Sequence, residues 1–150
     1  MQIVSPRFGT LVVEPSRIIE FPRGLIGFEH CKRFSLFHPE GGTPDYFILQ
    51  SLDDPAIAFH ITDPAKLGFA YEIALSDAEA ADLALGAGGP RTVNSADGSA
   101  APLGVVVMLS KEGSEQPVRA NLNGPLIINL EARRGLQHVF VRLDYNLTPA

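Results

Sequence analysis

The sequence has 150 residues, of which 45% are hydrophobic, and its formal net charge is −5. A chain of this length forms one domain that buries roughly 70% of its unfolded surface, so its core needs no disulfide or metal. The sequence has no basic patch to neutralise phosphates, which excludes the usual route to RNA or DNA binding. The single cysteine, Cys31, excludes an internal disulfide and is expected to be a small, half-buried apolar residue.

Short apolar runs alternate with turn residues along the whole chain, a pattern typical of an antiparallel sandwich or barrel. We therefore predict an all-β fold, a single small antiparallel β-barrel-like domain spanning residues 1–150. The expected strands lie near Ile3 and at Thr10–Val13, Arg17–Phe21, Arg33–His38, Tyr46–Leu52, Ile57–Thr62, Gly104–Leu109, Val118–Leu122, Leu126–Leu130 and Leu136–Leu143.

Three of the connections have recognisable turn chemistry. In Phe21–Gly24 the proline is set for the second turn position and the glycine for the fourth. Asp53–Pro55 predicts an Asx-type reversal between two strands. Asp63 is expected to cap a short helical turn that starts at Pro64.

One helix is expected at about residues 76–85. Ser76 and Glu79 form a capping box, strong helix formers follow, and Gly86 is expected to end the helix. Such a short helix must dock on the barrel to be stable. Residues 86–102 are rich in Gly, Ala, Ser and Pro and are expected to be a flexible insertion within the domain, and residues 144–150 a tail.

The amino terminus "MQIVSPRFG" lacks the charged-then-apolar layout of a signal peptide. The apolar runs, of which Leu103–Leu109 is among the longest, fall far short of the roughly 20 residues that a membrane helix needs. We therefore expect a cytoplasmic protein that does not bind a membrane.

The sequence contains no pattern typical of a catalytic site, so we expect no catalytic residues. His30, Cys31 and His38 match no structural zinc spacing, so we expect no metal and no cofactor. Neither Ser51 nor Ser110 has the Gly-x-Ser-x-Gly context of a nucleophile elbow. Residues 86–89, "GAGG", follow a helix and lack the Lys-Ser/Thr of a phosphate loop.

The charge is unevenly distributed. Between Asp45 and Leu85 there is one base, Lys66, against eight acids, which gives this stretch −7 and the rest of the chain +2. The acids are Asp45, Asp53, Asp54, Asp63, Glu72, Asp77, Glu79 and Asp82. Two interpretations stay open: a solvated surface, or a docking surface for a basic protein.

The segment Arg119–Gln137, "RANLNGPLIINLEARRGLQ", reads as strand, turn, strand, turn, strand. Asn123 begins the first reversal, and Pro125 starts the next strand, where its missing N–H costs little. With no nucleophile, base or metal partner beside them, Asn121 and Asn129 are interpreted as groups that fix backbone geometry.

Three segments together resemble the flagellar assembly factor FliW family. They are Ile18–Leu36 with "F-P-x-G-L-x-G-F-E", Tyr46–Pro64 with "L-Q-S-L-D-D-P-x-x-A-F", and Arg119–Gln137 with "N-L-x-x-P-x-x-I-N-x-x-x-x-x-G-x-Q". Each is ordinary turn-and-strand sequence alone, but all three occur in the family's order and at similar spacing. The resemblance reaches from about Ile3 to about Val141.

The resemblance implies a cytoplasmic, β-barrel-like binding protein without enzymatic activity. Its partners would be flagellin and the RNA-binding translational repressor CsrA, so that export of flagellin frees the factor to capture CsrA. We take Asp53, Asp54, Asn121 and Asn123 as candidate partner-binding residues, with turn capping as the competing role for each. Gly124 departs from the pattern, where an alanine is expected, and so does the long 86–102 segment.

Two other functions are compatible with an all-β domain. One is a small-ligand-binding β-barrel with a cavity inside, which the nine phenylalanines disfavour because large side chains fill small barrels. The other is a hydrolase built on Asp54, His60 and Ser51, for which we expect no activity.

Overall fold

The computed structural model of the chain describes residues 2–5, 9–37, 47–68, 70–86, 92–95, 103–110 and 119–139. The strands are β1 (Gln2–Ser5), β2 (Gly9–Val12), β3 (Ile18–Glu20), β4 (Arg33–Phe37), β5 (Phe47–Ser51), β6 (Ala58–Thr62), β7 (Glu72–Ala74), β8 (Thr92–Asn94), β9 (Leu103–Ser110), β10 (Arg119–Ala120), β11 (Leu126–Asn129) and β12 (Arg134–Gln137). The helices are the 3-10 turns η1 (Pro15–Arg17) and η2 (Pro64–Leu67) and the α-helix α1 (Asp77–Asp82).

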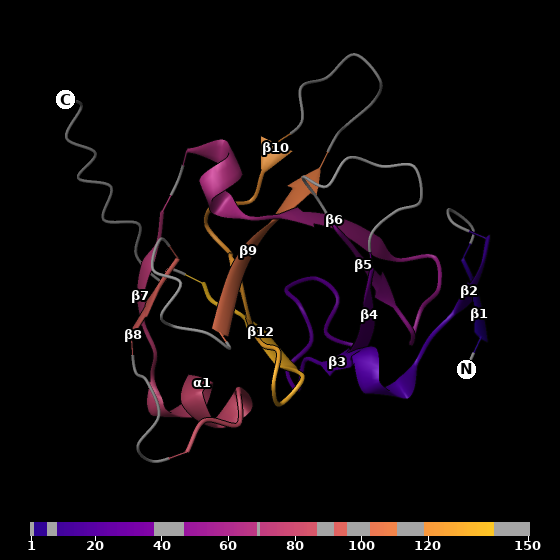
Figure 1. Cartoon of the computed structure of the whole chain (residues 1–150), viewed down its shortest axis with the longest axis horizontal. Coiled ribbons are helices and arrows are strands. Elements are labelled where there is room, and N and C mark those ends of the chain that lie inside the picture. The colour runs from indigo at the N-terminus through magenta and orange to yellow at the C-terminus, as the bar shows by residue number, and fades with distance from the viewer. Residues whose placement is uncertain are drawn as a thin grey trace.

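Seven strands form a closed barrel in the order β9-β11-β12-β3-β4-β5-β6, and the pairing of β6 with β9 completes the ring (Figure 1). This confirms the predicted all-β, barrel-like fold with one short helix. The pairings are antiparallel except for β12 with β3, which run parallel and meet at Arg134 and Glu20. The expectation of a purely antiparallel barrel is therefore wrong at this one joint.

The longest strand of the barrel, β9, bridges its two halves. Its first half, Leu103–Val106, pairs with β11, and its second half, Val107–Leu109, pairs with β6. The short strand β10 continues the β11 edge by pairing with Leu109 and Ser110. A single continuous strand thus ties the amino-terminal strands to the carboxy-terminal ones.

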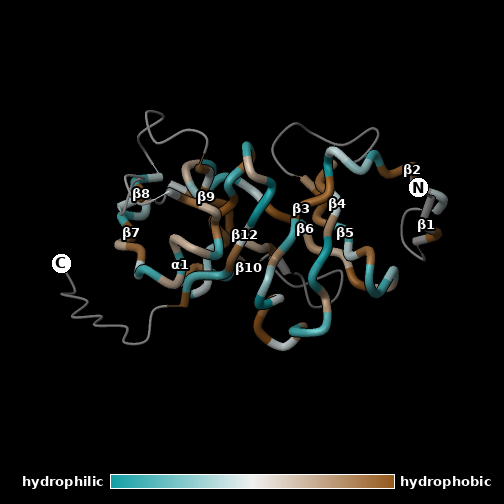
Figure 2. The backbone as a smooth tube through the Cα atoms, turned by 90° about the horizontal axis from the view of Figure 1, so that it is seen from below, coloured by the Kyte–Doolittle hydropathy of each residue, from teal (hydrophilic) through white to brown (hydrophobic). Residues whose placement is uncertain are grey.

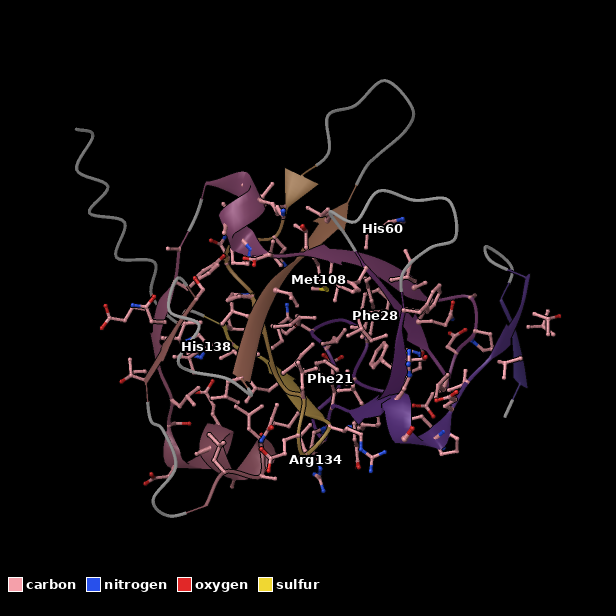
Figure 3. The ribbon with its side chains drawn as sticks, viewed as in Figure 1. Phe21, Phe28, His60, Met108, Arg134 and His138 are labelled. Carbon is pink, nitrogen blue, oxygen red and sulfur yellow. The ribbon has the colours of Figure 1, made fainter. Side chains whose placement is uncertain are left out.

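Phenylalanine rings fill the barrel interior. Phe21 and Phe34 are fully buried and meet edge to face, with ring centroids 5.3 Å apart. Phe28 and Phe59 form a second edge-to-face pair at 5.2 Å, and Figure 3 shows Phe21 and Phe28 inside the ring. Edge-to-face packing is the arrangement that aromatic quadrupoles favour, so these pairs stabilise the core beyond the area they bury.

The connection between β3 and β4 curls across the middle of the ring (Figure 1). Leu25 and Cys31 on this loop are buried among the interior side chains. Its first turn is the predicted one, because Gly24 N–H donates to the Phe21 carbonyl at 2.8 Å. Cys31 is fully buried rather than half-buried, because it lies on the side of this loop that faces the barrel interior.

An outer layer covers one side of the barrel, where α1 and the β7–β8 hairpin pack over β9, β11 and β12. Residues alternate between the two cores along β11: Leu126 and Ile128 face the barrel interior, while Ile127 faces the outer layer. A strand buried on both faces has a continuous apolar sequence, which explains the run "LII". Figure 2 shows the β7–β8 and β1–β2 hairpins at opposite ends of the molecule.

The α-helix begins as predicted, with a complete Ser76–Glu79 capping box, but it ends at Asp82 rather than near residue 85. Ala84 adopts a left-handed conformation with φ of 58°, and the Leu85 N–H donates to the Ala80 carbonyl at 2.9 Å. This is a Schellman-type end, for which glycine is the usual residue. The prediction that Gly86 ends the helix is therefore wrong, because the alanine already takes that conformation.

Two strands were not expected. β7 pairs with β8, and β8 lies inside the segment predicted to be a flexible insertion. Val93 on β8 is buried in the outer core, which gives this part of the segment a fixed place. Residues 87–91, 96–102 and 144–150 lie outside the described residues, as do the ends of several expected strands, including His38 and Tyr46.

Most other strand limits shift by one or two residues. β12 begins at Arg134, two residues earlier than expected, and ends at Gln137, six residues before the predicted end at Leu143. The two helical caps at Asp63 and Ser76 are where they were predicted. Among the residues that the structure describes, no helix is long and apolar enough to cross a membrane.

Candidate partner-binding surface

Asp53 holds the start of β4 against the β5–β6 turn. Its Oδ2 accepts hydrogen bonds from the backbone N–H groups of Lys32 at 2.7 Å and Arg33 at 2.9 Å. Its Oδ1 lies 3.3 Å from Nη2 of Arg33. One carboxylate thus satisfies two backbone donors and pairs with the guanidinium of the same strand.

Partial burial alone would raise the pKa of Asp53. The hydrogen bonds from the Lys32 and Arg33 N–H groups and the Arg33 guanidinium outweigh burial and hold the pKa below its ordinary value of 3.8. The carboxylate is therefore charged at neutral pH, and it already accepts hydrogen bonds from its own protein.

Asp54 shapes the reversal that follows. Its Oδ1 accepts from the Ala56 N–H at 3.2 Å, which is the predicted Asx-type turn. Its own N–H donates to the Ser51 hydroxyl at 3.0 Å, and its Oδ2 lies 3.7 Å from Nε2 of the exposed His30. With 41% of its side chain exposed, Asp54 is partly accessible to a partner.

The three residues of the hydrolase alternative do not converge. Ser51 is fully buried, and its hydroxyl accepts the Asp54 N–H. The register of β5 and β6 places His60 opposite Ile48, three residues along the strand from Ser51. Figure 3 shows His60 at the outer edge of the barrel. A nucleophile and base must lie within hydrogen-bond reach, so this arrangement is not a triad.

Asn121 and Asn123 are exposed at the β10–β11 turn, with β6 and β9 between them and the aspartate pair. The Asn121 N–H donates to the Met108 carbonyl at 2.8 Å. Tyr71 from the outer layer fixes the same turn, because its hydroxyl donates to the Leu122 carbonyl at 2.6 Å. The four candidate residues therefore occupy two separate turns.

Gln137 is a connecting residue that sequence reasoning missed. Its Nε2 donates to the Gly124 carbonyl at 3.1 Å, and its Oε1 accepts from the Ile26 N–H at 2.9 Å. Gln137 therefore joins the β3–β4 loop inside the barrel to the β10–β11 turn, which carries Asn121 and Asn123. A Cβ at position 124 would stand 2.5 Å from this Nε2, so the glycine found there leaves room for the Gln137 amide.

Asn129 fixes the β11–β12 turn, as the sequence predicted. Its Oδ1 accepts from the N–H groups of Glu131 at 3.1 Å and Ala132 at 3.2 Å. Its Nδ2 donates to the Leu83 carbonyl at the end of α1, at 2.8 Å. One buried amide thus organises a turn and anchors the helix.

Part of the acidic stretch is used within the molecule. Asp82 of α1 pairs with Arg23 of the interior loop at 2.5 Å, and Glu79 lies 2.6 Å from Nδ1 of His138. Both pairs tie α1 to the barrel. Of the eight acids in this stretch, those exposed in the described part are Asp53, Asp63, Glu72 and Asp77, and Asp45 lies outside it.

The structure also locates the residues considered for a metal site. His30 is exposed, Cys31 is buried in the interior and His38 lies outside the described residues. Within the described part of the chain, no group of three or more His, Cys, Asp or Glu side chains is placed to hold a metal ion.

Comparison with known proteins gives one consistent result. The family model of the FliW protein matches residues 2–149. A flagellar assembly factor FliW from Azoarcus sp. strain BH72 is 47% identical, with 98% of this chain and 96% of that protein covered. The FliW from Chromobacterium violaceum is 38% identical, with 96% of each chain covered.

The fold gives the same answer. A crystal structure of the flagellar assembly factor FliW superposes with a TM-score of 0.76 at 25% identity, covering 96% of this chain and 92% of that one. The two proteins therefore share the fold described above. The chain belongs to the FliW family of flagellar assembly factors.

Proposed function

We propose that this protein is a cytoplasmic binding protein that holds newly made flagellin and, when flagellin has left, captures the translational repressor CsrA. Capture of CsrA would relieve repression of flagellin synthesis, so the level of flagellin would control its own translation. The observation that carries this proposal is the near full-length match to the FliW family, at up to 47% identity among the relatives compared.

The charge of the surface supports the CsrA half of the proposal. Four acids are exposed on the segment that carries −7 in the sequence. A negative surface attracts a basic RNA-binding protein and repels RNA phosphates, which favours release of RNA from the complex. The protein acts here by binding alone, without catalysis or a cofactor.

A pull-down from extract of a flagellated bacterium tests the function. The tagged protein is expected to recover flagellin or CsrA in near-stoichiometric amounts. Recovery of small molecules alone would overturn the proposal and favour a small-ligand-binding barrel.

The residue-level proposal is tested by RNA competition. Purified CsrA bound to a labelled RNA is titrated with wild-type protein and with the Asp54→Asn variant. The asparagine side chain keeps an oxygen, Oδ1, that can accept the hydrogen bond of the Asx turn, but it lacks the negative charge of the carboxylate. We expect weaker release of RNA by the variant, and unchanged release would remove Asp54 from the partner surface.

Three further variants complete this test. Asn121→Ala and Asn123→Ala probe the second turn, and Glu131→Gln in the β11–β12 turn is a control that removes one exposed charge outside the acidic stretch. Asp53→Asn is less informative, because Asp53 also holds two backbone N–H groups. A binding loss in that variant must be compared with its unfolding midpoint.

A further inference from the structure

A groove with a positively charged rim lies between η1 and the β11–β12 turn. Its central hollow, of about 300 Å³, has an apolar floor formed by Ile19, Leu36, Phe37 and Phe47. Ser16 and Arg17 of η1 form one wall, and Leu130 and Arg133 of the turn form the other. Leu130 is 57% exposed, so its side chain adds accessible apolar surface beside the apolar floor.

Two neighbouring hollows extend this groove. One shares Arg17, Leu36 and Phe37 with the central hollow and reaches Val12 on β2. The other shares Arg133 and continues past Glu20 to Arg134 on β12. The groove therefore runs along η1 from the amino-terminal hairpin to the parallel joint of the barrel.

Its charge is the reverse of the molecule's. Among the described residues, the three hollows are lined by four arginines, Arg17, Arg33, Arg133 and Arg134, against two glutamates, Glu14 and Glu20. The chain as a whole carries −5. Arg33 is paired with Asp53, and Arg17 lies 3.6 Å from the exposed Glu14. Figure 3 shows Arg134 at the outer edge of the barrel, its nitrogen atoms pointing away from the ribbon.

The turn that presents two of these arginines is held in a costly conformation. Arg133 has φ of 56°, a left-handed conformation that glycine or asparagine adopts more easily. The Asn129 hydrogen bonds fix this turn from one side. On the other side, Nη1 of Arg133 donates to the Pro15 carbonyl at 2.8 Å and so joins the two walls of the groove. Non-glycine residues in such conformations concentrate at functional sites.

We propose that this groove binds an acidic amphipathic segment of a protein partner, with an apolar side chain in the central hollow and carboxylates on the arginine rim. The inference goes beyond the function proposed above, because it concerns a groove of opposite charge, which adjoins the first candidate surface at the Arg33–Asp53 pair, and it holds whichever partner carries the segment. Guanidinium groups bind carboxylates through paired hydrogen bonds, so the rim selects acidic residues over amides.

The shape favours a protein segment over a small amphiphilic anion. Three adjoining hollows that share lining residues match a chain that places one side chain in each, whereas a compact anion fills one of them. The exposed Leu130 adds an apolar contact at the rim of the groove. An amphipathic helix that lies in a groove packs its apolar face against such contacts.

The test uses a fluorescein-labelled synthetic helix of about four turns, with leucine on one face and glutamate along both flanks. The matched peptide has glutamine in place of every glutamate, and decanoate serves as the small-anion probe. Fluorescence anisotropy with the full chain is expected to show binding of the glutamate peptide, about tenfold tighter than the glutamine peptide and weakened by salt.

Variants locate the site. The double change Arg17→Gln and Arg134→Gln, and separately Leu130→Ser, are expected to weaken the glutamate peptide by about tenfold. Lys66→Gln is the control for the loss of a positive charge elsewhere, because it removes one cation from η2 at another part of the barrel. Urea unfolding of each variant confirms that it is folded.

Three results would overturn the inference. They are equal binding of the glutamate and glutamine peptides, wild-type binding by the arginine and leucine variants, and decanoate binding at least as tight as that of the glutamate peptide. The third would assign the groove to a small amphiphilic anion. None of them bears on the recovery of flagellin or CsrA, so the two proposals stand or fall separately.

Discussion

The ring of Phe21 lies so close over Gly135 that a Cβ on the glycine would stand 2.6 Å from Cζ of the phenylalanine. Phe21 is fully buried and also packs edge to face on Phe34, so it has no free space into which to move. The glycine in the "EARRG" turn is therefore set by an aromatic ring that lies more than a hundred residues away in the sequence.

The Gly135→Ala variant is expected to be less stable by about 1–3 kcal/mol, because the added methyl group overpacks the core. Urea unfolding measures this. Gly104→Ala is the matched control, since Gly104 is also a strand glycine but a Cβ added to it would meet no atom within 4 Å. Its stability should stay the same or rise by up to about 1 kcal/mol. Equal losses in the two variants would contradict the packing argument.

Asn129→Ala is expected to lower the free energy of unfolding by about 2–3 kcal/mol. It removes three hydrogen bonds and leaves the buried Leu83 carbonyl without its amide donor. Asn121→Ala, at an exposed position, is expected to change stability by less than about 0.5 kcal/mol. If Asn129→Ala unfolded at the wild-type urea concentration, Asn129 would not be the anchor of α1.

The Glu79–His138 contact predicts a pH-dependent stability. Burial raises the pKa of Glu79, but hydrogen bonds from Ser76 and His138 outweigh it and hold the pKa below the ordinary 4.5. A carboxylate with a lowered folded pKa contributes stability in full above its unfolded pKa. That contribution is lost as the pH falls through the folded pKa.

Glu79→Gln is therefore expected to be less stable than wild type at about pH 7, and the difference is expected to shrink towards about pH 3, because protonation of the carboxyl removes its charge from the folded wild type. Thermal unfolding at both pH values checks this. Glutamine still suits the N3 position of a capping box, so the variant isolates the loss of charge. A difference that is the same at both pH values would show that charge is not the cause.

Gly24 and Gly27 lie three residues apart on the interior loop, and both have positive φ, 66° and 83°. They differ in surroundings: a Cβ at Gly24 would stand 2.7 Å from the backbone of Glu29, whereas Gly27 has open space. Gly27→Ala is expected to cost about 1–2 kcal/mol for its backbone conformation alone. Gly24→Ala should cost at least about 2 kcal/mol more, since backbone atoms cannot yield as a side chain can. Calorimetry comparing the two unfolding transitions is the measurement.

The elements that the sequence predicts well are those with local causes. The Ser76 capping box, the Asp63 cap and the Asp54 reversal each depend on residues within three positions of one another, and all three are present. Strand patterns located most of the barrel in the same way. The parallel joint of β12 with β3 could not be read locally, because it depends on how the whole ring closes.

The candidate site is predictable in part. Polarity and position at turns singled out Asp53 and Asn129, but not their partners, since the groups they bind lie 20 or more residues away for Asp53 and 46 away for the Leu83 carbonyl. Gln137 is singled out in the sequence only as the last residue of the pattern that ends in "G-x-Q", and that pattern does not reveal its two partners, the Gly124 carbonyl and the Ile26 N–H. The arginine-rimmed groove likewise combines η1 with a turn more than a hundred residues later.

The parallel joint has a consequence for synthesis of the protein on the ribosome. β12 follows every other barrel strand in chain order, yet it pairs with the first of them, β3. Until Arg134 has been added, β3 has no neighbour on one side, and its unpaired backbone groups are available to other chains. The growing polypeptide thus stays an open sheet, at risk of wrong pairing, until its last barrel strand arrives.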